Sequence, residues 1–204
     1  MPKTADPAVR MALIDHAARI TAEEGRDALT LRRLTTAVGV STMAVYTHFG
    51  GMDHLRREVR REGFARLAAH LDAVDRSGDA AADLVALGWA YYVNGTTNPN
   101  LYRAMFMDGP CDEADATVGL DTFERLVDGV RRCVETGRFT SADPVELATQ
   151  LWVAAHGVVS LELAGMLPPD QAMVSLRTIS RNLLHAFGDS PAATGRSLPT
   201  TEGD

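Results

Sequence analysis

Helical spacing of apolar residues runs through almost the whole chain, and this feature narrows the possible folds most. Within residues 7–24, for example, the residues predicted to face inward are Met11, Leu13, Ile14, Ala17, Ala18 and Ile20. The alternation of β-branched and polar residues that is typical of strands is missing. The sequence therefore predicts an all-α fold.

Capping residues and helix breakers divide this pattern into about nine helices. Pro7 and Gly25 mark the start and end of the first helix, and Thr30 and Ser41 are predicted N-caps. The predicted helices cover residues 7–24, 31–38, 42–49, 53–74, 80–94, a short segment after Pro99, 114–136, 144–167, and a last helix from the "PPD" segment to about Phe187. The polar, Pro- and Gly-rich residues 188–204 are predicted to be disordered.

Charge is distributed unevenly along the 204 residues. The net charge is −7 at pH 7, but residues 1–65 sum to +2 and residues 66–204 to −9. Such asymmetry indicates an N-terminal part that meets a polyanion and an acidic remainder that keeps the protein in solution.

Several classes of protein are disfavoured. Two cysteines, Cys111 and Cys133, are too few for a disulfide framework and are interpreted as core residues. No apolar run is long enough to span a bilayer and no signal peptide is visible, so we expect a cytoplasmic protein without a membrane partner. The sequence holds no phosphate-binding glycine loop, Cys-x-x-Cys pair or His-Glu-x-x-His motif, so we predict no enzyme, metal site or cofactor.

Residues 30–49, "TLRRLTTAVGVSTMAVYTHF", have the pattern of a helix-turn-helix unit, with Gly39 at the sharp turn. In the second helix Val45 and Phe49 lie one turn apart and are predicted to face the core. The residues left on the outer side are Thr42, Met43, Tyr46, Thr47 and His48. Hydroxyl and imidazole donors in this position suit phosphate contacts, while the start of the helix suits base edges.

Residues 28–55, "ALTLRRLTTAVGVSTMAVYTHFGGMDHL", together with the preceding helix, resemble the DNA-binding domain of TetR-family transcriptional regulators. The family pattern is an N-cap Thr, a Gly-Val turn and Tyr-x-His-Phe before the fourth helix, and the match covers about residues 9–56. The resemblance implies phosphate contacts by Thr30, Tyr46 and His48, and base contacts by Thr42, Met43 and Arg32. The candidate DNA-binding residues are thus Thr30, Arg32, Ser41, Thr42, Met43, Tyr46, Thr47 and His48.

One position departs from the family pattern. Many members carry a Lys or Ser-Lys just before the fourth helix, where this chain has Gly51 and Met52. A phosphate contact at this point would come instead from the Gly51 N–H, or from Arg56 and Arg57.

The second half resembles the ligand domain of a TetR subgroup that carries a Trp and a His-Gly pair, here Trp152, His156 and Gly157. The resemblance implies a helix-turn-helix domain over residues 1–52 and a helical ligand-binding and dimerisation domain over 53–187. The candidate ligand-lining residues are Trp89, Tyr91, Tyr92, Tyr102, Met105, Phe106, Phe123, Trp152 and His156. For the set as a whole, ordinary core packing stays open as an alternative to ligand binding. For His156, two roles stay open: it hydrogen-bonds a ligand, or it satisfies a neighbouring backbone carbonyl.

The predicted helix over 144–167 is apolar nearly all round, so it must be covered on more than one side. The last predicted helix adds further apolar residues, namely Met173, Leu176, Ile179, Leu183, Leu184 and Phe187. Little chain remains to cover these two helices, so we predict that they meet the same two helices of a second subunit.

Three functions are compatible with these features. The favoured one is a dimeric repressor that binds a palindromic double-stranded DNA operator and is released by a small, mostly apolar effector. The second is a constitutive or architectural DNA-binding regulator without a ligand. The third is an α-helical enzyme or carrier that retains the N-terminal motif, and it would need clustered acid, base or metal-binding residues where the sequence offers only His156.

Overall fold

The structure, a computed structural model, describes residues 6–107, 117–140 and 143–198. Every regular element within these ranges is helical, which confirms the all-α prediction. In chain order the elements are α1 (Pro7–Glu24), the 3₁₀ helix η1 (Arg26–Ala28), α2 (Leu31–Val38), α3 (Thr42–Phe49), α4 (Met52–Asp72), α5 (Ala80–Thr97), α6 (Pro99–Phe106), α8 (Leu120–Glu135), α9 (Pro144–Leu163), α10 (Pro169–Ala186) and α11 (Pro191–Ser197). Among the described residues, no helix is long and apolar enough to cross a membrane.

The chain divides into two compact units. They comprise residues 1–66 with 98–119, and residues 67–97 with 120–204. This division differs from the predicted boundary after residue 52, because the first part of α4 and all of α6 belong to the first unit. Leu101 and Ala104 of α6 are buried in the same cluster as the core residues of α1, although they lie far away in the sequence.

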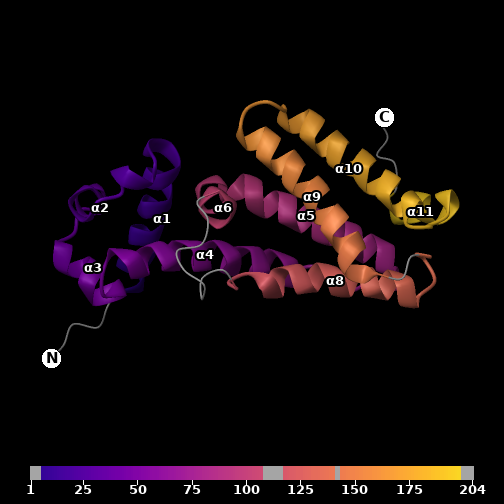
Figure 1. Ribbon diagram of the computed structural model, residues 1–204, viewed down its shortest axis with the longest axis horizontal. Coiled ribbons are helices and arrows are strands. Elements are labelled where there is room, and N and C mark those ends of the chain that lie inside the picture. The colour runs from indigo at the N-terminus through magenta and orange to yellow at the C-terminus, as the bar shows by residue number, and fades with distance from the viewer. Residues whose placement is uncertain (1–5, 108–116, 141–142, 199–204) are drawn as a thin grey trace. The chain divides into compact units, whose positions relative to one another are not determined.

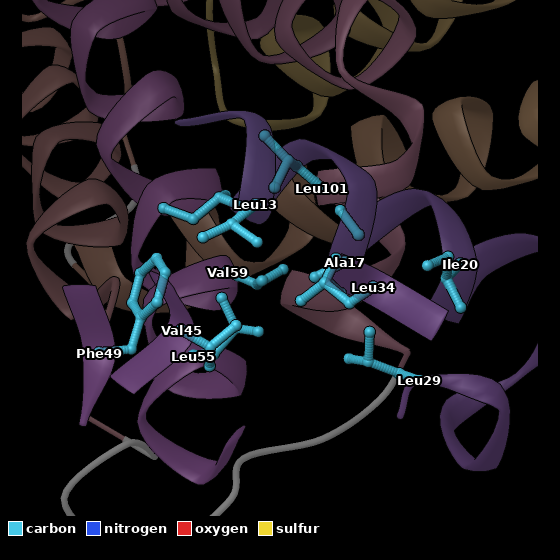
Figure 2. Close-up of a cluster of buried hydrophobic side chains, with 13 residues drawn as sticks. Leu13, Ala17, Ile20, Leu29, Leu34, Val45, Phe49, Leu55, Val59 and Leu101 are labelled. Carbon is cyan, nitrogen blue, oxygen red and sulfur yellow. The ribbon is translucent and has the colours of Figure 1, made fainter. Parts of the chain in front are cut away.

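The core of the first unit is built around α1, which packs against α2, α3 and α6. Leu13 and Ala17 are fully buried within it (Figure 2), and so is Ile14. The other buried members are Ala18, Ile20, Leu29, Leu34, Val45, Phe49, Leu55, Val59, Leu101 and Ala104. Because burial of a leucine or isoleucine side chain contributes about 1.5–3 kcal/mol, this cluster dominates the stability of the unit.

Caps fix the ends of the two short helices α2 and α3. The Thr30 side chain accepts a hydrogen bond from the Arg33 N–H at 3.3 Å, as expected for an N-cap. Gly39 ends α2 in the left-handed conformation, with φ 76°, which glycine adopts without a steric penalty. The chain therefore makes a tight turn between α2 and α3, as the helix-turn-helix pattern predicts.

α4 and α6 approach each other closely at Gly63. A Cβ atom at this position would lie 2.7 Å from the Met105 sulfur, so a larger residue would displace the buried methionine. The Arg60 Nε donates to the Met105 carbonyl at 3.2 Å, and Arg66 forms an ion pair with Asp15 of α1 at 2.9 Å. These contacts tie the N-terminal part of α4 to α1 and α6.

The second unit has its own core, formed by α5, α8, α9, α10 and α11. α5 packs against α8 and α9, and α10 lies beside α9 in the antiparallel direction (Figure 1). The buried members include Ala81, Leu84, Val127, Val130, Cys133, Phe139, Leu147, Ala148, Leu184 and Phe187. Cys133 is thus a core residue as predicted, and its burial raises the pKa of the thiol to about 12. Cys111 lies outside the described residues.

The segment 188–204 was predicted to be disordered, but the structure forms α11 within it. Polar contacts with other parts of the chain explain why this segment forms a helix. The carboxylate of Asp189 accepts two hydrogen bonds from Arg138, at 2.7 and 2.8 Å, and the Ser197 hydroxyl donates to Asp79 at 2.6 Å. Composition indicates a polar tail but does not show that its polar groups have partners elsewhere in the chain. The end of this tail lies outside the described residues.

Other helix bounds agree with the sequence to within a few residues. α5 continues to Thr97, beyond its predicted end, and α9 ends earlier than predicted, at Leu163. α8 begins at Leu120, directly after Gly119 with φ 95°. Its predicted start near Ala114 lies outside the described residues.

Candidate nucleic-acid interface

α3 buries one side and presents the other side to solvent. Val45 and Phe49 lie in the core of the first unit, which confirms their predicted orientation (Figure 2). On the opposite side Met43 is 64% exposed and Tyr46 is 51% exposed. We call this surface the outer face of α3 and define it by the exposed residues Ser41, Thr42, Met43, Tyr46 and Thr47.

Polar groups on the outer face are mostly available for a partner. Within the described part of the chain, the hydroxyls of Ser41, Thr42 and Tyr46 make no hydrogen bond. The Thr47 hydroxyl is the exception, because it donates to the Met43 carbonyl at 2.8 Å. Free hydroxyl groups on an exposed helix suit the phosphate oxygens of a nucleic acid.

His48 differs from its neighbours because it is only partly exposed. Its ring lies against that of Phe49, with ring centroids 6.0 Å apart. The imidazole thus lies at the edge between the core side and the outer face, in the last turn of α3.

Two consecutive arginines at the start of α2 have different surroundings. Arg33 forms an ion pair with Glu24, whereas the neighbouring Arg32 is exposed and has no ion pair or side-chain hydrogen bond among the described residues. A cation in the first turn of a helix is disfavoured by the helix dipole, so Arg32 lies where an anion is favoured. Thr30, the preceding N-cap, is exposed as well.

The start of α4 is partly occupied by internal contacts. Arg56 pairs with Asp53 at 2.9 Å and reaches the Leu29 carbonyl at 3.4 Å. Arg56 is therefore already engaged in the first unit. Gly51 lies beside the N-terminus of α4, where backbone N–H groups favour anions.

Predicted ligand-lining residues of the second unit contact one another. The Tyr91 hydroxyl and the His156 Nδ1 lie 2.9 Å apart, and the ring of Trp152 lies 5.8 Å from that of His156 and 6.0 Å from that of Phe123. Trp89 packs edge-on against Tyr92, with ring centroids 5.7 Å apart. Burial lowers the pKa of His156 below its usual value. The ring is thus neutral at physiological pH.

Tyr92 has a partner that sequence reasoning missed. Its hydroxyl donates to the Glu162 carboxylate at 2.7 Å, and burial together with this hydrogen bond raises the pKa of Tyr92 to about 12. Ser160 was missed as well. Its buried hydroxyl has no hydrogen-bond partner among the described residues, and it follows His156 by one turn of α9. The spacing of four residues between His156 and Ser160 is the sequence pattern that could have indicated that Ser160 lies on the same side of the helix as His156.

Three other predicted ligand-lining residues belong to the first unit. Tyr102 and Met105 are almost fully buried, and the Tyr102 ring lies 5.0 Å from that of Phe106. Phe106 also packs edge-on against Phe64 at 5.6 Å. These side chains contribute to the packing of α6 against α4.

Comparison with known proteins finds similar families for both halves of the chain. Residues 13–59 match a family described as "Bacterial regulatory proteins, tetR family". Residues 84–183 match one described as "Tetracyclin repressor-like, C-terminal domain". The first match contains α2, α3 and the intervening turn, and the second begins within α5 and ends within α10.

Individual relatives agree with these matches. The uncharacterised HTH-type transcriptional regulator YobS of Bacillus subtilis is 30% identical over 97 residues, 47% of this chain and 50% of YobS. The HTH-type transcriptional repressor Rv1474c of Mycobacterium tuberculosis is 40% identical over 72 residues, 34% of this chain and 38% of the repressor. The chain is thus matched over no more than half the length of either relative. The crystal structure of RolR with the ligand resorcinol has the same fold, with a TM-score of 0.59 at 19% identity over 95% of this chain and 94% of RolR.

Proposed function

This chain belongs to the TetR family of bacterial transcriptional regulators, and we propose that it is a repressor that binds a palindromic operator as a homodimer and leaves it when a small, mostly apolar ligand binds. Members of this family are DNA-binding regulators and not enzymes. The relative Rv1474c is named a repressor, which supports that direction of regulation. The observation that carries the proposal is the outer face of α3, with its exposed side chains and free hydroxyl groups.

On this proposal α3 enters the major groove of the operator. Tyr46 and His48 contact phosphates from the later turns of α3, and Thr42 and Met43 reach base edges from its first turn. The remaining contacts are assigned to Thr30, Arg32, Ser41 and Thr47, which lie on the exposed surface of α2 and α3. Arg32 is exposed and unpaired among the described residues, so it is available to bind DNA.

Dimerisation is proposed through α9 and α10. Val153 and Leu161 of α9 are exposed one turn to either side of Gly157, and nothing lies within 4 Å of where a Gly157 Cβ would be. On α10, Met173 and Val174 are exposed as well. Exposed apolar side chains on the two packed helices α9 and α10 support a protein interface at these helices.

Part of the predicted dimer surface is used inside the chain. Leu176 and Leu184 of α10, and Phe187 directly after it, are buried in their own unit. The interface proposed from the structure therefore rests on Val153, Leu161 and their exposed neighbours rather than on Leu184.

The ligand is proposed to bind in the second unit beside Trp152 and His156. RolR was crystallised with resorcinol, so a small aromatic ring with hydroxyl groups is a reasonable probe. The orphan hydroxyl of Ser160, one turn after His156, provides a polar group for such a ligand. A ligand that binds the DNA-free form ~100-fold more tightly than the DNA-bound form contributes about 2.7 kcal/mol per site to release from the operator. Because this coupling is reciprocal, operator DNA must weaken ligand binding by the same factor.

A specific observation favours the constitutive alternative. Tyr91 already pairs with His156, and Tyr92 with Glu162, so two of the polar groups in this region have partners without a ligand. A constitutive regulator would keep these pairs under all conditions.

Selection from a random duplex library tests the proposal. The purified chain should enrich a palindrome whose half-sites lie about 10–10.5 base pairs apart, centre to centre, on one face of the duplex. Resorcinol and related phenols are then screened for thermal stabilisation. A compound that stabilises the protein should also weaken operator binding, and Trp152→Phe should reduce the stabilisation while leaving DNA affinity intact. Enrichment of no sequence contradicts the repressor, and stabilisation without an effect on DNA binding favours the constitutive regulator.

A further inference from the structure

α3 lacks the side chains that read most bases by paired hydrogen bonds. Arg and Lys recognise guanine in this way, Asn and Gln recognise adenine, and Asp and Glu accept a hydrogen bond from cytosine. None of these six residue types occurs between Thr42 and Phe49. Base recognition by this helix must therefore depend on hydroxyl groups, the His48 imidazole and apolar surface.

Met43 is the more exposed of the two large apolar residues on the outer face, Met43 and Tyr46. The residue is 64% exposed and lies in the first turn of α3, the part of a recognition helix that contacts base edges. The core does not need it, because Val45 and Phe49 already provide the buried side of α3.

Thr47 extends this apolar surface by one helical turn. Its hydroxyl donates to the Met43 carbonyl at 2.8 Å, so the methyl group is the part of the side chain that remains for an external contact. Residues four apart lie on the same side of a helix, and Met43 and Thr47 have this spacing. In the major groove the apolar feature that distinguishes a base is the 5-methyl group of thymine.

We propose that Met43, with the Thr47 methyl group beside it, recognises the 5-methyl group of a thymine in each half-site of the operator. This inference rests on the proposed function, since it requires the outer face of α3 to enter the major groove. It adds the chemical class of the contact: a T·A pair is chosen by its methyl group and not by paired hydrogen bonds.

The experiment uses the full chain and the duplex obtained by selection. Each thymine is replaced in turn by deoxyuridine, which pairs identically and lacks only the methyl group. At one thymine per half-site, the replacement should weaken wild-type binding about fourfold, the effect expected for one buried methyl group. Met43→Ala should bind the thymine and uracil duplexes equally well, and Met43→Leu should keep the preference.

A matched control is Met107→Ala. Met107 is an exposed methionine of the same unit, and its loss should leave the preference for thymine unchanged. Circular dichroism confirms that each variant is folded. If uracil has no effect at any position, or if Met43→Ala discriminates as well as wild type, the inference is overturned while the DNA-binding function stands. If selection yields no duplex, the proposed function itself fails.

Discussion

One exposed tyrosine of the first compact unit and two tyrosines of the second differ in whether their hydroxyl groups have partners within the chain. On the outer face of α3 in the first unit, the Tyr46 hydroxyl has no partner within the described residues. In the second unit, Tyr92 donates to Glu162 and Tyr91 lies in hydrogen-bond contact with His156. The two regions are thus distinguished by their hydrogen bonds: the Tyr46 hydroxyl is available to an external partner, whereas the Tyr91 and Tyr92 hydroxyls have partners inside the chain.

This difference has a consequence for regulation. On the proposed function, the free hydroxyl groups on the outer face of α3 bind DNA without first losing an internal hydrogen bond. A ligand that uses His156 or Glu162 must replace an existing hydrogen bond with Tyr91 or Tyr92. On the proposed function, ligand binding starts from two existing hydrogen-bonded pairs, and its net effect depends on how well the ligand restores those bonds.

The largest effect is expected from breaking the polar cluster that holds α11. Asp189 is buried and paired with Arg138, and hydrogen bonds from Arg138 and Thr194 outweigh the effect of burial and lower the pKa of Asp189. Arg138→Ala should lower the free energy of unfolding by about 3 kcal/mol, because the buried Asp189 carboxylate loses its cationic partner. Urea unfolding measures the change.

Arg131→Ala is the control for that experiment. Arg131 pairs with Asp128, and both side chains are about half exposed, so the loss should be under about 1 kcal/mol. An equal effect of the two substitutions would show that the α11 cluster contributes no more than a surface ion pair.

A smaller effect is expected at the proposed dimer interface. Val153→Asp places a charge on the exposed apolar surface of α9 and should weaken dimerisation on the order of 100-fold, with a parallel loss of operator affinity. Sedimentation at several concentrations measures the dimer. Val93→Asp changes an exposed valine of α5 and should have no effect on the dimer. A dimer that tolerates Val153→Asp would contradict an interface on this side of α9.

The smallest effect concerns pH. Burial lowers the pKa of His156, so below about pH 6.5 the unfolded chain binds a proton that the folded chain does not. Stability contributed by the neutral ring is therefore lost as pH falls through the lowered pKa. His156→Gln should make the free energy of unfolding less dependent on pH between about 7.5 and about 5.5. If the pH dependence of the free energy of unfolding is the same in wild type and His156→Gln, a group other than His156 causes it.

The sequence predicted most of the first unit because its signals are local. The cap at Thr30, the turn at Gly39 and the spacing of Val45 and Phe49 all lie within 20 residues, and the structure contains each of them. The exposure of Tyr46 agrees with the same spacing, since residues three and four apart share one face of a helix and Tyr46 is only one residue after the buried Val45.

The second unit was less predictable because its decisive contacts join distant residues. Glu162 is 70 residues from Tyr92, and Arg138 is 51 residues from Asp189. Periodicity indicates which side of a helix is apolar, but it carries no information about which charged group meets which. For this reason the polar composition of residues 188–204 predicts disorder, and no local pattern indicates that Glu162 has a partner.

Matched substitution of two tyrosines tests the central claim most directly. Tyr46→Phe and Tyr92→Phe each remove one hydroxyl, from the outer face of α3 and from the Glu162 pair respectively. We predict that Tyr46→Phe weakens binding to the selected operator about fivefold without changing the free energy of unfolding. Tyr92→Phe should lower the free energy of unfolding by about 1 kcal/mol and leave operator affinity unchanged. Normal operator affinity of the Tyr46→Phe variant, or a loss of affinity confined to Tyr92→Phe, would contradict the assignment of the outer face of α3 to DNA.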